Sequence, residues 1–146
     1  MGGLFSEVTD EAATGTIRTA IELGVSYVDT APLYGHGKSE RFYGAAPAGV
    51  PRDRFAISTK VGRVLVPVDH FDEPPQFYNV PMDAPVYDYS QDGVLRSLEE
   101  SLQRLQLDQV DMLLIHNAAE FYHRRGGPAG RPFGGRIKHP QPEEIS

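Results

Sequence analysis

Apolar and polar positions follow one another along the chain in blocks that predict helices and short strands in turn. Thr9, followed by Asp10 and Glu11, predicts a helix start, because a threonine side chain caps the first turn and carboxylates favour the positive end of the helix dipole. Apolar residues then recur at helical spacing up to Gly24, which predicts the helix end. These apolar positions are Ala13, Ile17, Ala20 and Ile21.

Further blocks continue the same alternation as far as residue 116. They predict a strand at 26–29, a helix from Lys38 to Tyr43 closed by Gly44, a strand at 55–60, a helix capped by Ser90 with Val94, Leu95, Leu98, Leu102 and Leu105 along one face, and a strand at 110–115. Helices alternating with strands predict an α/β fold with a parallel sheet and helical crossovers. The last strand is almost wholly apolar, which predicts that both of its faces are covered.

Two segments break this pattern. Residues 61–89 hold five prolines and no sustained periodicity, so we expect an irregular loop of functional importance or high flexibility. From Asn117 onward the sequence is rich in glycine, proline and arginine, which predicts a disordered C-terminal tail. The expected organisation is therefore one structured domain over residues 1–116 and a tail over 117–146.

Composition and charge narrow the classes of partner. The net charge of −6 argues against nucleic acid, since phosphate binding needs a basic face. Residues 117–146 carry five basic and three acidic side chains, whereas residues 1–116 carry nine and seventeen, so the charge also changes at the expected boundary. The chain has no apolar stretch long enough to span a membrane and no secretory leader pattern. Cysteine is absent, which excludes disulfides and thiolate metal sites and fits a cytoplasmic location.

Four ionisable side chains stand where strands end. Asp29, Lys60 and His116 close the three predicted strands, and Tyr34 lies in the loop after the first. Taken singly, each has an ordinary structural explanation as a cap, a packing residue or a solvated loop residue. In parallel α/β barrels, however, the carboxyl ends of the strands form the active-site face, so repeated placement there predicts a shared site.

The sequence around these residues resembles the aldo-keto reductase family. The segments 24–35 (GVSYVDTAPLYG, continuing through Ser39-Glu40), 58–63 (STKVGR) and 111–116 (DMLLIH) match three blocks of that family in order. The segments 86–90 and 96–102 are most similar to its sugar-oxidising branch, which includes D-threo-aldose 1-dehydrogenase, L-fucose dehydrogenase and pyridoxal 4-dehydrogenase relatives. The resemblance covers roughly residues 2–116 and implies a partial (β/α)8 TIM barrel, comprising about the first half.

The resemblance also implies a reaction and a role for each residue. Tyr34 would be the general acid in carbonyl reduction, and the base when an alcohol or sugar lactol is oxidised. Lys60 would favour the phenolate form electrostatically, and Asp29 would hold Lys60 and contact an NADP or NAD cofactor. His116 would bind and orient the oxygen of a small carbonyl or sugar substrate. The implied function is NAD(P)-dependent hydride transfer within carbohydrate metabolism.

The chain also departs from the family pattern. A full barrel takes about 250 residues, and nothing after His116 resembles the half that holds the cofactor phosphates. This predicts a truncated enzyme with impaired cofactor binding. The alternative is a non-catalytic half-barrel fragment or interaction module derived from the family. An open half barrel exposes strand edges, which allow self-association, although no sequence feature specifically supports a dimer.

Three other interpretations carry less weight. Gly35-His36-Gly37-Lys38-Ser39 resembles the end of a phosphate-binding loop, but Pro32 occupies the position of its first glycine. The five histidines form no ligand-spaced cluster, so no metal site is expected. Three tyrosines near the long loop serve either as packing residues or as the lining of a sugar-sized site: Tyr78, Tyr87 and Tyr89.

Overall fold

A computed structural model describes residues 2–47 and 49–117 of the 146-residue chain. Within those ranges the elements follow this order: α1 (Asp10–Glu22), β1 (Tyr27–Asp29), α2 (Lys38–Ala45), the 3-10 helix η1 (Arg52–Arg54), β2 (Ala56–Val61), β3 (Arg63–Pro67), β4 (Asp83–Tyr87), α3 (Gln91–Leu105) and β5 (Met112–Ile115). Every helix and strand predicted from the sequence is present, with ends shifted by one or two residues.

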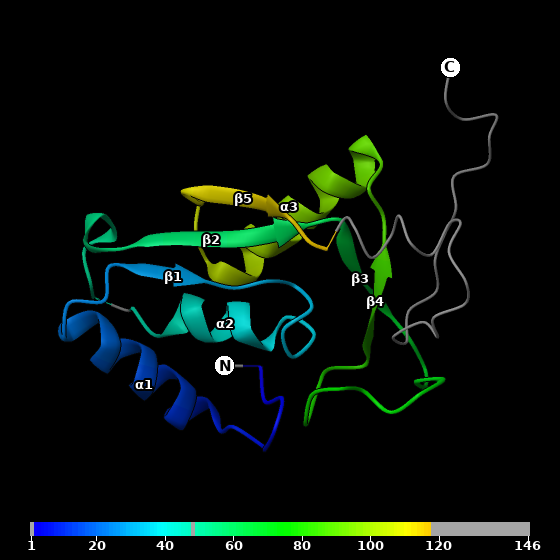
Figure 1. The fold of residues 1–146 in the computed structure, drawn as a ribbon, viewed down its shortest axis with the longest axis horizontal. Coiled ribbons are helices and arrows are strands. Elements are labelled where there is room, and N and C mark those ends of the chain that lie inside the picture. Colours follow the sequence, from blue (N-terminus) through cyan, green and yellow to red (C-terminus); the bar gives the residue numbers. More distant parts are fainter. Residues whose placement is uncertain (1, 48, 118–146) are drawn as a thin grey trace.

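Three strands form a parallel sheet in the order β1-β2-β5, with β2 in the middle (Figure 1). Asp29 of β1 pairs with Ser58 of β2, and Lys60 of β2 pairs with Leu114 of β5. Because all three strands run the same way, their carboxyl ends meet at one edge of the sheet. The predicted α/β class with helical crossovers is confirmed.

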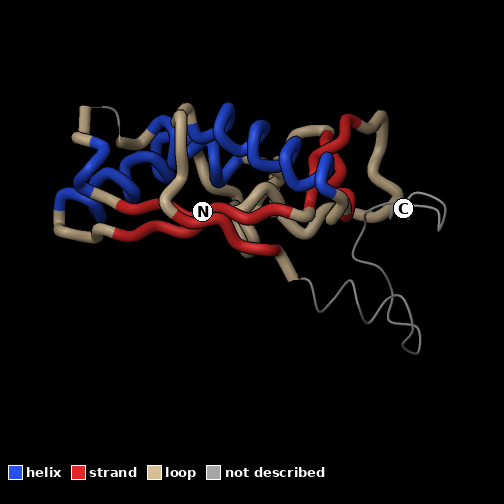
Figure 2. Tube along the Cα trace, turned by 90° about the horizontal axis from the view of Figure 1, so that it is seen from above, coloured by secondary structure: helices blue, strands red, loops and turns tan. Residues whose placement is uncertain are grey.

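The helices cover one face of this sheet only. Viewed along the sheet, α1, α2 and α3 lie in a layer on one side of the strands, and the other side carries no helix within the described residues (Figure 2). The apolar core lies between the two layers. Its buried members are Ala13, Ile17, Ile21, Val28, Phe42, Ala46, Phe55, Ile57 and Leu105.

Strand periodicity sorts the residues of β2 between the two faces. Successive side chains of a strand point to opposite sides. Ile57 packs in the core beneath the helices, and Thr59 contacts a helix side chain on the same face. Ser58 and Lys60 therefore lie on the face of the sheet that carries no helix in the described part of the chain. Asp29 of β1 lies on the same face and bonds to both.

The helix ends follow the capping chemistry of the sequence, with one exception. The hydroxyl of Thr9 accepts a hydrogen bond from the Ala12 amide at 3.2 Å, and the hydroxyl of Ser90 accepts one from the Gly93 amide at 3.1 Å. Gly44 was expected to close the second helix but lies inside α2. A Cβ there would approach the carbonyl oxygen of Leu105 to 2.7 Å, so the glycine permits close packing of α2 on the end of α3.

The expectation of an irregular segment over 61–89 is wrong in part. β3 and β4 form an antiparallel pair joined by residues 68–82, with Leu65 opposite Pro85 and Arg63 opposite Tyr87. Proline lacks an amide hydrogen and is tolerated here because the sheet has two strands, so each strand has an unpaired edge. Because the segment contains five prolines, its sequence pattern did not predict these two strands.

The burial expected for α3 and β5 is also corrected. The most buried positions of α3 are Gly93, Ser97, Ser101 and Leu105, whereas Leu95 of the predicted apolar face is 50% exposed. All four residues of β5 are exposed, from 40% to 65%. The reason is tertiary: α3 packs against β2 and β3, and β5 is the edge strand of the sheet, with β2 as its neighbour. Their apolar sequences suit a larger barrel.

The predicted tail and its domain boundary fall almost entirely on residues 118–146, which lie outside the described residues. Within the described part, no helix combines the length and apolar character needed to cross a bilayer.

Candidate active site

The carboxyl ends of β1 and β2 bring together a carboxylate and an ammonium. Lys60 Nζ lies 2.6 Å from Asp29 Oδ2 and donates a second hydrogen bond to the carbonyl of Thr30 at 2.8 Å. The Ser58 hydroxyl donates to the other carboxylate oxygen of Asp29 and accepts a hydrogen bond from Tyr27 at 2.9 Å. The register explains the meeting, since Ser58 is opposite Asp29 and Lys60 follows it on the same face.

Tyr34 lies in the loop after β1, with its ring against this ion pair. Lys60 Nζ is 4.8 Å from the ring centroid. The loop is closed by short turns, in which the amide of Tyr34 donates to the Ala31 carbonyl at 3.1 Å. Gly35 follows with φ +65, a left-handed conformation that turns the chain back after the tyrosine.

His116 completes the set from the third strand. It directly follows β5, its amide donates to the Val61 carbonyl at 2.9 Å, and its own carbonyl accepts a hydrogen bond from the Tyr89 hydroxyl. Its ring is 5.8 Å from the ring of Tyr34, edge to face at 75°, and only 4% of the residue is exposed. The structure thus brings all four predicted site residues together, in the contact order Asp29, Lys60, Tyr34 and His116.

A cavity of about 450 Å³ opens beside this edge, between the loop after β1 and the β3–β4 pair. Its walls combine prolines and phenylalanine rings with nearly as many polar and charged side chains. They are formed by Leu33, His36, Arg63, Phe71, Glu73, Pro74, Pro75, Gln76, Phe77, Pro85 and Asn117. The polar side chains among them offer hydrogen-bond partners to a small polar ligand.

His36 connects the loop of Tyr34 to the wall of this cavity, and no sequence pattern indicated this role. Its ring nitrogen Nδ1 donates to the carbonyl of Asp83 at 2.6 Å, and its ring packs edge to face on Phe71 and Phe77. Burial lowers the pKa of His36, an effect that its hydrogen bond to the Asp83 carbonyl and the charge of Asp83 oppose. The neutral imidazole therefore holds residues 33–37 against the hairpin.

The three tyrosines of the long segment do not line the cavity. Tyr87 is 2% exposed and stacks on Tyr89 at 6.1 Å, and the guanidinium of Arg63 lies 4.2 Å from the Tyr87 ring centroid. Tyr78 is 52% exposed. Tyr87 and Tyr89 are thus packing residues, as one of the two sequence interpretations held.

The structure does not support the phosphate-loop interpretation. Lys38 Nζ donates to the Tyr78 carbonyl at 3.3 Å, and the Ser39 hydroxyl is buried against Thr30. Lys38 and Ser39, which would bind phosphate and metal in such a loop, thus bond to other parts of the protein. In the described ranges, no group of three histidine or carboxylate side chains is placed to hold a metal ion.

Comparisons with known proteins agree with this geometry. The sequence profile of the Aldo/keto reductase family matches residues 1–124. The chain is 38% identical to a D-threo-aldose 1-dehydrogenase of a Pseudomonas species over 123 residues, covering 80% of this chain and 37% of that protein. It is 34% identical to a pyridoxal 4-dehydrogenase of Microbacterium luteolum over 133 residues, covering 84% of this chain and 39% of that protein.

Among solved structures, the glycerol dehydrogenase of Gluconobacter oxydans superposes with a TM-score of 0.59 at 29% identity. The match covers 79% of this chain and 32% of that one. The chain thus spans less than two-fifths of the length of these relatives. The prediction of a partial barrel, comprising roughly the first half of this fold, is confirmed.

Proposed function

The chain belongs to the aldo/keto reductase family, and on that premise we propose that it serves NAD(P)-dependent hydride transfer to or from an aldose or another aldehyde or alcohol. The observation that carries the proposal is the unbroken line of contacts from Asp29 through Lys60 and Tyr34 to His116. A carboxylate, an ammonium, a phenol and an imidazole at one sheet edge form a proton-transfer set. Similarity to sugar and pyridoxal dehydrogenases supports the substrate class.

Tyr34 is the residue that moves the proton. In the oxidative direction its phenolate oxygen takes the hydroxyl proton of the alcohol or lactol, and in the reductive direction its hydroxyl returns a proton to the carbonyl oxygen. The ammonium of Lys60, 4.8 Å from the ring centroid, stabilises negative charge as it develops on the phenol oxygen. Asp29 and the carbonyl of Thr30 keep that ammonium in place.

His116 contacts the ring of Tyr34 and orients the substrate oxygen. Its ring is packed edge to face on the Tyr34 ring and is almost fully buried, so its position is fixed before a substrate arrives. The cavity is lined in part by Leu33 and Asn117, the sequence neighbours of Tyr34 and His116. Preorganised hydrogen-bond donors of this kind lower the barrier to reaction by stabilising charge as it develops.

A nicotinamide nucleotide is the cofactor that the family implies, and the residues present fit its reacting end. Bound there, it supplies the hydride or accepts it. Asp29, whose side chain is 38% exposed at the rim, would contact it through carboxylate oxygens. The set of Tyr34, Lys60 and His116 performs the matching proton transfer, which hydride chemistry at a carbonyl requires.

A second candidate function rests on β5. Its four residues are 40% to 65% exposed, an apolar strand of the kind that protein interfaces cover. This observation favours a non-catalytic interaction module that keeps the fold without turnover. The two functions differ in what Tyr34 contributes.

The deciding experiment measures nicotinamide reduction by the purified chain with a panel of aldoses and simple alcohols, using NAD and NADP in turn. We expect Tyr34→Phe to lower kcat/KM by about 100-fold or more, because it removes the proton-transfer group. Tyr78→Phe, an exposed tyrosine outside the site, is the matched control and is expected to keep full activity. Equal activity of the Tyr34→Phe variant and the unmodified chain would overturn the proposal.

A further inference from the structure

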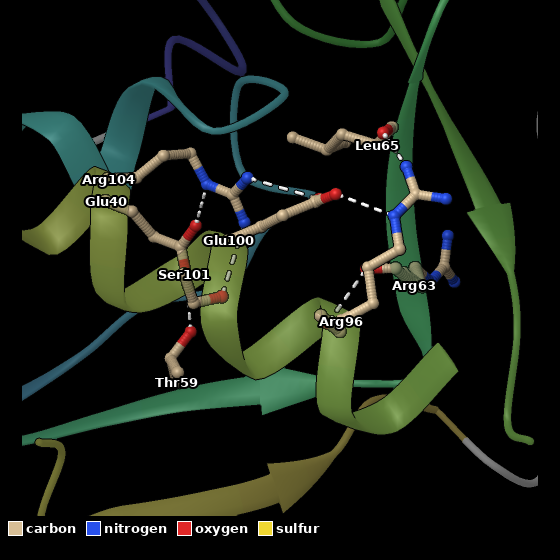
Figure 3. Close-up of polar contacts among 9 residues, drawn as sticks. Glu40, Thr59, Arg63, Leu65, Arg96, Glu100, Ser101 and Arg104 are labelled. Carbon is tan, nitrogen blue, oxygen red and sulfur yellow. Dashed lines mark hydrogen bonds and ion pairs between the residues drawn. The ribbon is translucent and has the colours of Figure 1, made fainter. Parts of the chain in front are cut away.

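Glu40 is a buried carboxylate that the proposed reaction does not use. It is 0% exposed, lies in the first turn of α2, and both of its oxygens are bonded. Oε1 accepts a hydrogen bond from the Thr59 hydroxyl at 2.6 Å, and Oε2 accepts one from Arg104 Nε at 2.6 Å (Figure 3). Burying a charge is costly unless it is paired and hydrogen-bonded. The two partners of Glu40 meet this requirement.

The preceding residue, Ser39, makes two contacts with the chain that follows β1. Its hydroxyl accepts a hydrogen bond from the buried Thr30 hydroxyl at 2.9 Å. Its backbone amide donates to the carbonyl of Tyr34 at 3.1 Å. One dipeptide at the start of α2 therefore contacts the chain after β1 at two points and β2 at a third.

These contacts fall beside the proposed active-site residues in a specific way. Thr30 follows Asp29, and its carbonyl is itself a hydrogen-bond acceptor of Lys60 Nζ. Thr59 precedes Lys60, and the alternation of the strand turns its side chain to the helix layer while Lys60 faces the opposite side. Helix α2 thus holds β1 and β2 together on the helix-covered face of the sheet, next to the residues that form the ion pair on the opposite face.

Helix α3 keeps the guanidinium of Arg104 directed at Glu40. Arg104 Nη2 donates to the Ser101 hydroxyl at 3.3 Å, and Nη1 lies 3.7 Å from Glu100 Oε2 (Figure 3). Glu100 in turn bonds Arg96 at 2.7 Å. The side chain of Arg104 is only 10% exposed, so this support lies within the packed interface between α2 and α3.

We propose that Ser39 and Glu40 are positioning residues, which set the placement of Lys60 against Asp29 and Tyr34 through the hydroxyls of Thr30 and Thr59. The catalytic consequence rests on the proposed function, whereas the placement of Lys60 does not. Loss of either hydroxyl contact allows β1 and β2 to shift against each other, which loosens the ion pair and exposes the ammonium.

The test measures acetylation of Lys60 by acetic anhydride under native conditions, followed by mass spectrometry, with a lysine-containing peptide added at fixed concentration as the reference. Lys60 is 12% exposed and paired, so it reacts slowly in the unmodified chain. Thr59→Val and Ser39→Ala are expected to raise its rate about fivefold, the effect of one lost buried hydrogen bond. Thr59→Ser restores the hydroxyl and is expected to restore the slow rate.

Ser97→Ala is the matched control, because it removes a buried hydroxyl of α3 that donates to the Arg63 carbonyl at 3.2 Å, away from α2. It is expected to lower the urea midpoint by a similar amount and to leave the Lys60 rate unchanged. Equal acceleration in Ser97→Ala and Thr59→Val, or none in Thr59→Val, would show that Ser39 and Glu40 act on stability alone and would overturn the inference.

Kinetics separate this inference from the proposed function. If the unmodified chain turns over substrate, Thr59→Val is expected to lower kcat about fivefold with KM unchanged, and Thr59→Ser to recover it. If the unmodified chain shows no turnover but Thr59→Val still accelerates acetylation, the proposed function fails and the positioning role stands. A chain that turns over while Thr59→Val alters neither readout retains the function and refutes the role.

Discussion

The ammonium of Lys60 lies 4.8 Å from the centre of the Tyr34 ring while it bonds Asp29 at 2.6 Å. These three residues come from two strands and the loop between β1 and α2, so the ion pair and the ring contact exist only when the parallel sheet has formed. The side chain best placed to move a proton is therefore positioned by strand register. This relationship leads to the first of four predictions.

Replacement of Lys60 by methionine removes the charge beside Tyr34 and keeps a chain of similar length. We expect kcat/KM for alcohol oxidation to fall by about 100-fold, because the negative charge that develops on the Tyr34 oxygen during proton transfer loses its electrostatic stabilisation. Lys38→Met is the control, since the Lys38 ammonium donates to the Tyr78 carbonyl and lies over the Phe42 ring. Retention of full activity by the Lys60 variant would contradict the role given to the ammonium.

The buried pair of Glu40 and Arg104 predicts a large effect on stability. Glu40→Ala removes the nearer carboxylate of Arg104 and leaves it the more distant Glu100, 3.7 Å away, so we expect the free energy of unfolding to fall by about 3 kcal/mol. Urea unfolding followed by circular dichroism measures this change. Arg96→Ala, which breaks a pair whose arginine side chain is 52% exposed, is expected to cost less than about 1 kcal/mol. A similar fall in the free energy of unfolding in Glu40→Ala and Arg96→Ala would show that burial of the ion pair does not determine the size of the effect.

Asp111 predicts a dependence of stability on acid pH. Its hydrogen bonds to Arg52 at 2.5 Å and to the Ile57 amide at 2.8 Å lower the pKa of the carboxyl below its usual value. Because the folded-state pKa is the lower one, the stabilisation is complete above the unfolded value of about 4 and is lost as the pH falls through the folded value.

The measurement is the urea midpoint as a function of pH. We expect Asp111→Asn to lower the midpoint at neutral pH and to flatten its decline below pH of about 4, compared with the unmodified chain. Asp108→Asn changes an exposed carboxylate nearby and is expected to leave both the midpoint and its slope as they are. An acid decline of the same steepness in Asp111→Asn and the unmodified chain would count against the assignment.

The exposed strand β5 predicts concentration-dependent self-association. Leu113 and Ile115, 40% and 65% exposed, lie on one face of this edge strand. Replacing both with lysine is expected to shift the sedimentation profile toward the monomer. The free energy of unfolding is expected to change by less than about 0.5 kcal/mol. Phe5→Lys, at a 90% exposed position outside the sheet, is the control. An unchanged profile in the double variant would locate any association elsewhere.

The active-site residues could be found from the sequence because each follows a recognisable strand. Asp29, Lys60 and His116 each end a β-rich run, and Tyr34 follows the first within a glycine-containing loop. Parallel strands with helical crossovers place such ends at one edge, so local patterns were enough to predict their meeting. The family resemblance then gave each residue a role.

The cavity and the contacts behind the sheet could not be found in this way. His36 lies beside Tyr34 in sequence, but its partners Asp83, Phe71 and Phe77 belong to a segment that the prolines made irregular in appearance. Glu40 occurs in an ordinary helical turn, and only the structure brings Thr59 and Arg104 to its two oxygens. Contacts over such sequence separations leave no periodic signal.

The sequence by itself determined the helices, the parallel strands and the four residues at their ends, because hydrophobic periodicity and capping act over a few neighbouring positions. Only the tertiary structure decided which apolar residues are covered. The apolar sequence of β5 predicted burial, yet the strand is exposed, whereas the charged Glu40 is fully buried. Burial depends on which layers pack together, and that packing joins segments that the local sequence pattern does not connect.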